Sequence, residues 1–519
     1  MKNTSIIRTL LIVTLFITSF SDINAQVNEW SVPMGGNAGR NGLSQYLGPL
    51  VEQGGEPELY WSGGEYAKYA GLPAIEDDKL VVYRRWSSAA QTESWIVCYN
   101  VYDGTELWKV TLPLDPDADH YGKLSGVNNG QVYATRAGGF SEPSALIALD
   151  IETGDVLWQS EDKVTEYSFE TVSFCENGDI IAGNYDDILC ISKDDGTTLW
   201  TLDRHSWSSD GSSVACHGNK GYYWDIAPGT IDMVVSVCDL ETGELLYFSD
   251  PIYTSSMIIQ QSGLLVGNDG TIYAPRSNYD SINNTIVSLT DKGDHLQENW
   301  RRQIGFVTFC SHGVGPDNTV YTYSWDEQVI RLDPVTGEVL NTSIVVTDDG
   351  NPEDSFYPWI AIGDDGMVYL AIEDWPLHKL YFFTPELELL WSEEIYGLRG
   401  LALGDSVLAV NAKGTDIRAY KGRPNPGVGI TEMPETNNGL YIYPNPSNDV
   451  FNIAFKEGVQ SADARIDVIN VVGQVVYSEQ ITTATQTHLS VDISDQNDGL
   501  YVVRYFANKK YHFQKIVKQ

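Results

Sequence analysis

Short hydrophobic runs alternate with polar turn residues between residues 59 and 391, and they do so in a repeating order. Residues 121–158 show the unit clearly, with the runs KLSGV, QVYATRA, SALIALD and DVLW and the turns NNG and ETG. Asn-Gly and Thr-Gly pairs supply the positive φ angles that tight hairpins require. The pattern therefore predicts four short strands in each unit.

One phrase, of the form D-x-x-T-G-x-x-L-W, ends most units. Its copies end at Trp108, Trp158, Trp200 and Tyr247, and looser copies end at Trp300, Asn341 and Trp391. A period of about 40–50 residues is typical of repeat architectures. A four-stranded unit of this size cannot bury its faces alone, and radial stacking of such units gives a β-propeller. We expect the recurrent Trp on the outermost strand, in the gap between neighbouring units.

The two ends of the repeat region complement each other. Seven units are complete, and an eighth begins at residues 400–422 but lacks its fourth strand. The phrase PELYW at residues 57–61 can supply that strand, which would close the ring and remove its exposed edges. We therefore expect an all-β fold with an eight-bladed β-propeller over residues 26–421, and a seven-bladed ring is the alternative.

A different pattern begins after Lys421. Residues 422–439 show no apolar periodicity and are typical of a linker. Residues 440–519 hold about seven short strand-like runs, which predict a small Ig-like β-sandwich.

The first 25 residues predict export. Lys2 and Arg8 precede an apolar stretch from Leu10 to Phe20, and small and polar residues follow up to Ala25. This order is typical of a secretory signal peptide cleaved at Ala25. The apolar stretch is short for a membrane anchor, so we expect a protein that is not integral to the membrane.

The net charge of −39 falls almost entirely between residues 26 and 439. Such a field makes nucleic acid and anionic membrane surfaces poor partners. No D-x-[DN]-x-[DN]-G calcium loop occurs in the sequence. Six cysteines lie in strand-like runs, and both disulfides and buried free thiols are compatible with export.

The repeat region resembles a known family. The segment EWSVPMGGNAGRNGLS (29–44) and the repeated phrase are similar to quinoprotein-type propellers with pyrroloquinoline-quinone-like repeats. That family includes quinone-dependent dehydrogenases and the propeller of the outer-membrane protein assembly machinery. The dehydrogenases commonly carry adjacent cysteines and a Glu, Asn and Asp set for calcium, and neither can be assigned here. We expect no cofactor and no catalytic residues, with a quinone- and calcium-dependent enzyme as the alternative.

The C-terminal segment resembles the type A sorting domain of the type IX secretion system (Por secretion system). The matching elements are YPNPSND, I-x-V-x-N-V-V-G-Q-V-V, DISDQNDGLYVVR and KIVKQ. The residues carried over are Pro444, Asn445, Pro446, Gly473, Gln474, Asp492, Gly499, Leu500, Tyr501 and Lys515. The resemblance implies a Gram-negative bacterium of the Bacteroidota type, partnership with the type IX machinery, and secretion or surface display.

The connections on one face of the expected ring are long and rich in aromatic residues. They span residues such as 84–95 and 347–359 and carry Trp86, Trp95, Tyr121, Trp207, Tyr279, Phe356, Tyr357, Trp359 and Trp375. Rigid scaffolds place binding residues on such loops, although aromatic side chains also pack loops against strand ends. We expect a secreted or surface protein that binds a glycan, peptide or protein, and a structural envelope or matrix role is a further alternative.

Overall fold

The computed structural model divides into two compact units, Met1–Pro426 and Gly427–Gln519. It describes residues 30–52, 54–88, 91–112, 121–137, 144–164, 171–184, 186–205, 213–253, 263–276, 284–305, 311–347, 356–374, 378–424, 440–443, 450–455, 464–470, 475–481, 488–494, 496–497, 499–507 and 510–518.

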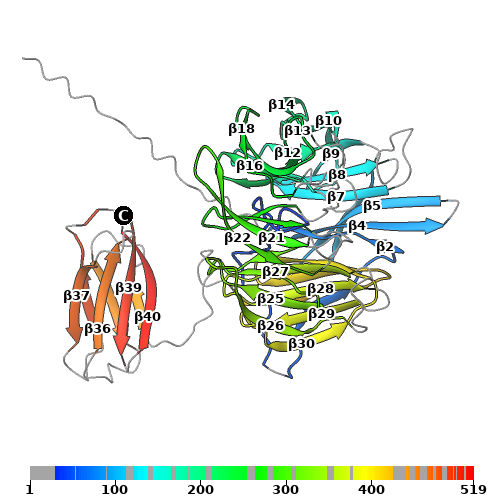
Figure 1. Cartoon of the computed structure of the whole chain (residues 1–519). Helices are drawn as coiled ribbons and strands as arrows, with labels where there is room; N and C mark the ends of the chain where they lie inside the picture. Colours follow the sequence, from blue (N-terminus) through cyan, green and yellow to red (C-terminus); the bar gives the residue numbers. More distant parts are fainter. Residues whose placement is uncertain are drawn as a thin grey trace, which may run out of the picture. The chain divides into compact units, whose positions relative to one another are not determined.

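The described part of the first unit contains eight antiparallel sheets (Figure 1). The first four sheets contain β2 (Tyr69–Ala70), β3 (Ala74–Glu76), β4 (Lys79–Ser88), β5 (Gln91–Asn100) and β6 (Glu106–Thr111); β7 (Tyr121–Asn128), β8 (Gln131–Ala137), β9 (Ser144–Asp150) and β10 (Val156–Val164); β11 (Ser173–Phe174), β12 (Ile180–Gly183), β13 (Asp187–Ile191) and β14 (Thr198–Asp203); and β15 (Ala215–His217), β16 (Lys220–Ile226), β17 (Met233–Asp239) and β18 (Leu245–Phe248).

The other four sheets follow the same order. They contain β19 (Leu265–Val266), β20 (Ile272–Arg276), β21 (Thr285–Asp291) and β22 (Leu296–Gln303); β23 (Gly313–Val314), β24 (Val320–Tyr323), β25 (Gln328–Leu332) and β26 (Val339–Val345); β27 (Phe356–Ile362), β28 (Val368–Asp374), β29 (His378–Phe383) and β30 (Leu389–Glu394); and β31 (Leu398–Gly404), β32 (Val407–Ala412), β33 (Ile417–Lys421) and β1 (Leu59–Gly63). The strands predicted in residues 121–158 are confirmed as β7 to β10.

The last sheet joins the two ends of the repeat region. β1 pairs antiparallel with β33, with Leu59 opposite Tyr420 and Gly63 opposite Ile417. The expectation that residues 57–61 complete the last sheet is therefore confirmed. The innermost strand β31 contacts β27 of the preceding sheet and β3 of the first sheet, an arrangement that is consistent with a propeller.

The repeated phrase is explained by contacts between successive sheets. Trp108 on the outer strand β6 donates from Nε1 to the carbonyl of Ile151 in the next sheet, at 2.7 Å. Its ring covers Gly154, which has φ +75°, and a Cβ at that glycine would lie 2.7 Å from the ring. Because the turn needs a positive φ and the ring needs the space, only glycine suits this position.

The same contact recurs around the unit. The Trp residues and the carbonyls that accept their Nε1–H are Trp61 and Val101, Trp158 and Lys193, Trp200 and Leu240, and Trp300 and Pro334. Each Trp also lies against the glycine of the turn in the neighbouring sheet. The expectation that Trp fills the gap between units from the outer strand is confirmed at these five positions.

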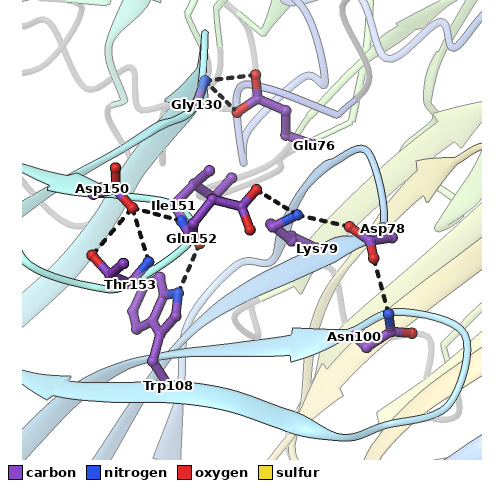
Figure 2. Close-up of polar contacts among 10 residues, drawn as sticks. All are labelled: Glu76, Asp78, Lys79, Asn100, Trp108, Gly130, Asp150, Ile151, Glu152 and Thr153. Carbon is purple, nitrogen blue, oxygen red and sulfur yellow. Dashed lines mark hydrogen bonds and ion pairs between the residues drawn. The ribbon is translucent and has the colours of Figure 1, made fainter.

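Polar bonds hold the receiving turn in place, as Figure 2 shows for the first and second sheets. The carboxylate of Asp150 accepts from the backbone N–H of Glu152 and Thr153 at 2.9 and 2.8 Å. Lys79 of the first sheet binds both Asp78 and Glu152 at 2.8 Å. The Asp and Thr of the phrase therefore shape the turn on which the neighbouring Trp docks.

The contact between the fourth and fifth sheets is different, because Tyr247 stands where the phrase usually has Trp. The carboxylate of Asp291 accepts from Tyr247 at 2.6 Å and from Lys220 and Tyr222 at 2.8 Å each. Burial by itself raises the pKa of Asp291, but the bonds from Lys220, Tyr247, the backbone of Gly293 and Tyr222 outweigh it and lower the pKa to about 2. A half-buried polar cluster replaces the Trp contact here.

Substitution of Asp291 by Asn is expected to destabilise the protein by about 1–3 kcal/mol at pH 7, since charged hydrogen bonds are lost. The carboxylate has a lower pKa in the folded chain than in the unfolded one, so its contribution is present above about pH 4 and lost as the pH falls towards 2. Urea unfolding of wild type and Asp291→Asn at pH 7 and pH 3 measures this. An equal difference at both pH values would contradict the assignment.

A strap formed by residues 30–44 connects the eight sheets at one end. Six of its backbone carbonyls accept hydrogen bonds from backbone N–H groups in or beside the inner strands. The acceptors and their donors are Trp30 and Ile75, Ser31 and Val127, Ala38 and Cys216, Gly39 and Val266, Asn41 and Val314, and Gly42 and Ile362. Arg40 donates to the third sheet at Thr171, and Ser44 donates to the eighth at Leu403. Most of these bonded residues lie near the short turn that joins the innermost strand of each sheet to the next strand. The strap therefore holds the inner strands at the end where these turns lie.

Five cysteines are buried free thiols: Cys98, Cys175, Cys190, Cys216 and Cys238. Burial raises the pKa of the Cys98 and Cys238 thiols to about 12, which keeps them protonated and poorly reactive. The sequence was compatible with disulfides or with buried free thiols, and the structure has free thiols at these five positions. Cys310 lies outside the described residues.

The second unit contains two small antiparallel sheets. One contains β34 (Leu440–Tyr443), β35 (Val450–Phe455) and β38 (His488–Asp492), and the other contains β36 (Ala464–Asn470), β37 (Val475–Ile481), β39 (Gly499–Ala507) and β40 (Lys510–Lys518). Apolar side chains from both sheets share one core, including Phe451, Val468, Val491 and Ile516. The buried Asp467 binds Arg465 and Arg504 at 2.7 and 2.8 Å.

Candidate ligand-binding face

The hairpin of β4 and β5 extends beyond the neighbouring hairpins. Each strand has ten residues, against seven in β8 and β9, and pairing continues to Ser88 opposite Gln91. Figure 1 shows this hairpin in light blue, projecting past the adjacent strands. The prediction of a loop over residues 84–95 is therefore wrong, because cross-strand pairing continues through most of the segment.

Arg84 fixes the base of this hairpin. Its side chain is 1% exposed and donates to Asn411 Oδ1 and to the carbonyls of Gly414 and Ala412 at 2.5, 2.5 and 2.8 Å. It also donates to the carbonyl of Glu65 at 2.7 Å. The guanidinium thus joins the first sheet to the eighth and holds the segment that connects them.

Two exposed aromatic residues meet beside this arginine, and we call Tyr66 and Trp86 the aromatic corner. Tyr66 is 52% exposed and Trp86 is 43% exposed, and their rings meet in an edge-type contact at 60° with centroids 5.1 Å apart. Tyr69 is opposite Arg85 on β4, and the guanidinium of Arg85 lies over one side of its ring at 4.3 Å. The corner therefore presents two touching aromatic rings to solvent.

Among the residues expected on the ligand face, Trp86, at 43%, is the one described side chain that is exposed. Trp95 lies on β5 at 8% exposure with Lys109 over its ring at 4.0 Å, Trp359 lies on β27 at 3% exposure, and Tyr357 on β27 is half-buried. The expected loop over 347–359 thus ends in a strand. The side chains of Tyr121 on β7 and Phe356 on β27, and all of Trp207, Tyr279 and Trp375, lie outside the described residues.

Tyr66 and Tyr69 were missed by reasoning from the sequence, which considered only the long connections between strands. They lie in the short segment between β1 and β4, and the local signal was limited to two tyrosines in the phrase YAKY. Tyr396, at 67% exposure between β30 and β31, was missed for the same reason. The pairing of β2 with β4 and the bonds between Ala67 and Gly414 hold the segment that carries Tyr66 and Tyr69 in place.

A titratable cluster lies on the seventh and eighth sheets. Glu373 is bonded by Arg399 and lies 3.8 Å from Lys413, and burial raises its pKa while the two cations oppose that rise. Burial, with Lys413 and Arg399, lowers the pKa of His378 to about 4, so its ring is neutral at pH 7. These groups form an ion-paired network rather than a nucleophile with its base. Within the described ranges no group of three His, Cys, Asp or Glu side chains can hold a metal ion.

The residues expected to carry the sorting function are partly described. Asp492 ends β38 and accepts from the N–H of Ser494 at 2.9 Å, and Tyr501 is buried and donates to the carbonyl of Asn497 at 2.6 Å. Gly499, Leu500 and Lys515 lie on β39 and β40, where Gly499 is opposite Lys518. Pro444, Asn445, Pro446, Gly473, Gln474 and the expected cleavage residue Ala25 lie outside the described residues.

Comparison with known families matches both parts of the chain. The family described as outer membrane protein assembly factor BamB matches residues 92–343, and the secretion system C-terminal sorting domain matches residues 441–519. The first part is therefore a PQQ-like, BamB-type β-propeller repeat region. The chain as a whole joins this repeat region to a Por secretion system C-terminal sorting domain, as both resemblances indicated.

Similar solved structures share little sequence with the chain. BamB from Moraxella catarrhalis is 14% identical, with 68% of this chain and 94% of that one covered and a TM-score of 0.47. A quinohemoprotein alcohol dehydrogenase from Pseudomonas putida HK5 is 12% identical, with coverages of 82% and 84% and a TM-score of 0.39. The C-terminal WD40 domain of Sif2 is 10% identical, with coverages of 73% and 99% and a TM-score of 0.46. No curated protein sequence matches the chain.

The sorting domain implies handling by the type IX secretion machinery and export across the outer membrane to the surface or the medium. Within the part of the chain that the structure describes, no helix has the length and apolar character needed to cross a membrane.

Proposed function

We propose that this chain is an exported, non-enzymatic binding protein of the Bacteroidota type, in which one unit binds and the other is the export signal. Residues 26–421 form a closed eight-bladed propeller after removal of a signal peptide at residues 1–25. Residues 440–519, beyond the linker 422–439, form a small Ig-like sandwich that directs export. The protein acts in the medium or at the cell surface, without a bound cofactor, on an extracellular ligand.

The aromatic corner is the observation that supports binding. Tyr66 and Trp86 leave about half of each ring in solvent and lie together, whereas Trp95 and Trp359 are packed inside the unit. Binding residues commonly stand on connections that a rigid scaffold positions, and clustered exposed aromatic side chains mark interaction sites. The strap bonds to the inner strands near their short turns, whereas the β4–β5 hairpin projects at the opposite end.

Adhesion of the purified, labelled full-length protein to cells and matrix of the producing bacterium tests the proposal. The double variant Tyr66→Ala, Trp86→Ala is expected to adhere at least about tenfold less, because truncating aromatic contacts at the centre of an interface commonly costs 2 kcal/mol or more. Phe248→Ala, which removes a similarly exposed aromatic side chain from the outer strand β18 of the fourth sheet, is the control. Equal adhesion of wild type and double variant would refute binding at this face.

A further inference from the structure

The backbone that carries the aromatic corner is bonded on both sides. Ala67 exchanges hydrogen bonds with Gly414 of the eighth sheet at 2.9 and 2.8 Å. On the other side, Lys68 donates to the carbonyl of Arg85 at 2.9 Å, and β2 continues this pairing along β4. Since Tyr66 and Tyr69 flank these bonded residues, their backbone is already ordered before a ligand arrives. Such preorganisation reduces the entropy cost of binding.

The ring geometry suits a compact ligand with a flat apolar face. The Tyr66 and Trp86 rings meet in an edge-type contact at 60°, with centroids 5.1 Å apart, so they form one continuous aromatic surface. The face of an aromatic ring is electron-rich and attracts polarised C–H groups. A pyranose sugar presents several C–H groups on one face and hydroxyls around its edge, which suits stacking on the exposed side of such a surface.

Among the described side chains, the apolar area at the corner is much smaller than a protein interface. Two half-exposed aromatic rings offer roughly 200 Å², about half of what two such side chains can bury. A specific protein interface needs about 800 Å² from each partner. The exposed aliphatic side chains that could enlarge the patch, such as Leu107, Leu157 and Leu199, lie on outer strands next to the docked Trp residues. A sugar unit needs no more area than the corner provides.

The polar groups around the corner suit a ligand rich in hydroxyl groups. Glu65 is paired with Lys109, so its charge is balanced, and Lys68 is exposed nearby. These groups can exchange hydrogen bonds with hydroxyls. The chain as a whole carries −39, and that field repels polyanions.

We propose that the aromatic corner is a carbohydrate-binding site for a neutral polysaccharide, with a pyranose ring stacked on the exposed surface of the Tyr66–Trp86 pair. This assignment rests on the proposed function, since it names the ligand class of the same face. Arg84 is a positioning residue, because it binds the carbonyl of Glu65 next to Tyr66 without reaching the ligand.

Affinity electrophoresis of the full-length protein tests the assignment. Native gels would contain mixed-linkage β-glucan, xylan, galactomannan or dextran as neutral probes, and alginate or polygalacturonate as acidic ones. Wild type is expected to be retarded in at least one neutral gel. Tyr66→Ala and Trp86→Ala are each expected to weaken that retardation about tenfold, in line with the loss of one central aromatic contact. Tyr66→Phe keeps the ring and is expected to retain binding, and Phe248→Ala, on the outer strand β18, controls for general surface changes.

Three outcomes would overturn the carbohydrate assignment: no retardation by any neutral probe, stronger retardation by the acidic probes, or retardation that both alanine variants retain. Urea unfolding of the variants separates loss of binding from loss of folding. If adhesion to cells depends on Tyr66 and Trp86 while no polysaccharide retards the protein, the proposed binding face stands and the sugar assignment fails. If adhesion is also independent of these residues, both fail.

Discussion

A chain that ends at Pro426 is expected to be retained in the periplasm almost completely, while the full-length protein reaches the surface or the medium. The deletion removes the second compact unit with its own core, which contains Phe451 and Val491, and leaves the first unit whole. Since residues 441–519 match the sorting domain, the export signal is lost and the repeat region is not. Immunoblots of periplasm, outer membrane and medium measure the distribution.

Retention in the periplasm indicates a sorting defect only if the truncated chain is folded. Resistance of the periplasmic protein to protease, compared with the purified full-length chain, provides that control. Surface display of the truncated chain at the wild-type level would show that residues 427–519 do not direct export, and the second unit would then need another role.

Arg84→Met is expected to lower the free energy of unfolding by about 3 kcal/mol or more. The guanidinium is buried and binds Asn411 and the carbonyls of Ala412, Gly414 and Glu65. The acceptors on Asn411 and Ala412 are buried, and each buried acceptor left without a partner costs about 1–3 kcal/mol. Because these bonds join the first sheet to the eighth, the loss falls on the contact that closes the repeat region. Urea unfolding followed by tryptophan fluorescence measures the change.

Lys421→Met is the matched control for this experiment. Lys421 is the last residue of β33 and forms an exposed ion pair with Glu58, just before β1, at 3.1 Å. An exposed pair contributes about 0–1 kcal/mol, so this variant is expected to unfold almost as wild type does. Similar losses from the two substitutions would show that the buried network of Arg84 has no special part in closure.

Much of the fold was predictable because its strands pair within short, local hairpins. The turns NNG and ETG in residues 121–158 require positive φ angles, and they mark the strand ends correctly. The strand at residues 57–61 was also predictable, since the phrase ending at Trp61 repeats the tail of the other units. Its pairing with β33 is long-range, yet the repeat specifies it.

The loops predicted over residues 84–95 and 347–359 were partly wrong, because a local sequence pattern does not show which side chains are buried. The residues from 84 to 95 are mixed polar and aromatic, as in a loop, but most of them extend a hairpin whose base is held by Arg84. Trp95 and Trp359 are typical of a binding loop by residue type, yet they are buried by neighbouring strands. Whether an aromatic side chain is packed or exposed depends on residues distant in the chain.

The sequence by itself determined the repeat, the four-stranded unit, the completion of the last sheet and the C-terminal sorting domain, because each rests on local turn chemistry or on a repeated or ordered motif. The tertiary structure decided which aromatic residues meet in solvent and where the strap lies. Tyr66 and Trp86 come together because Lys68 and β2 pair with β4, while Arg84 and Ala67 both bond to Gly414 of the eighth sheet. Such a site depends on long-range hydrogen bonds, which no pattern of neighbouring residues encodes.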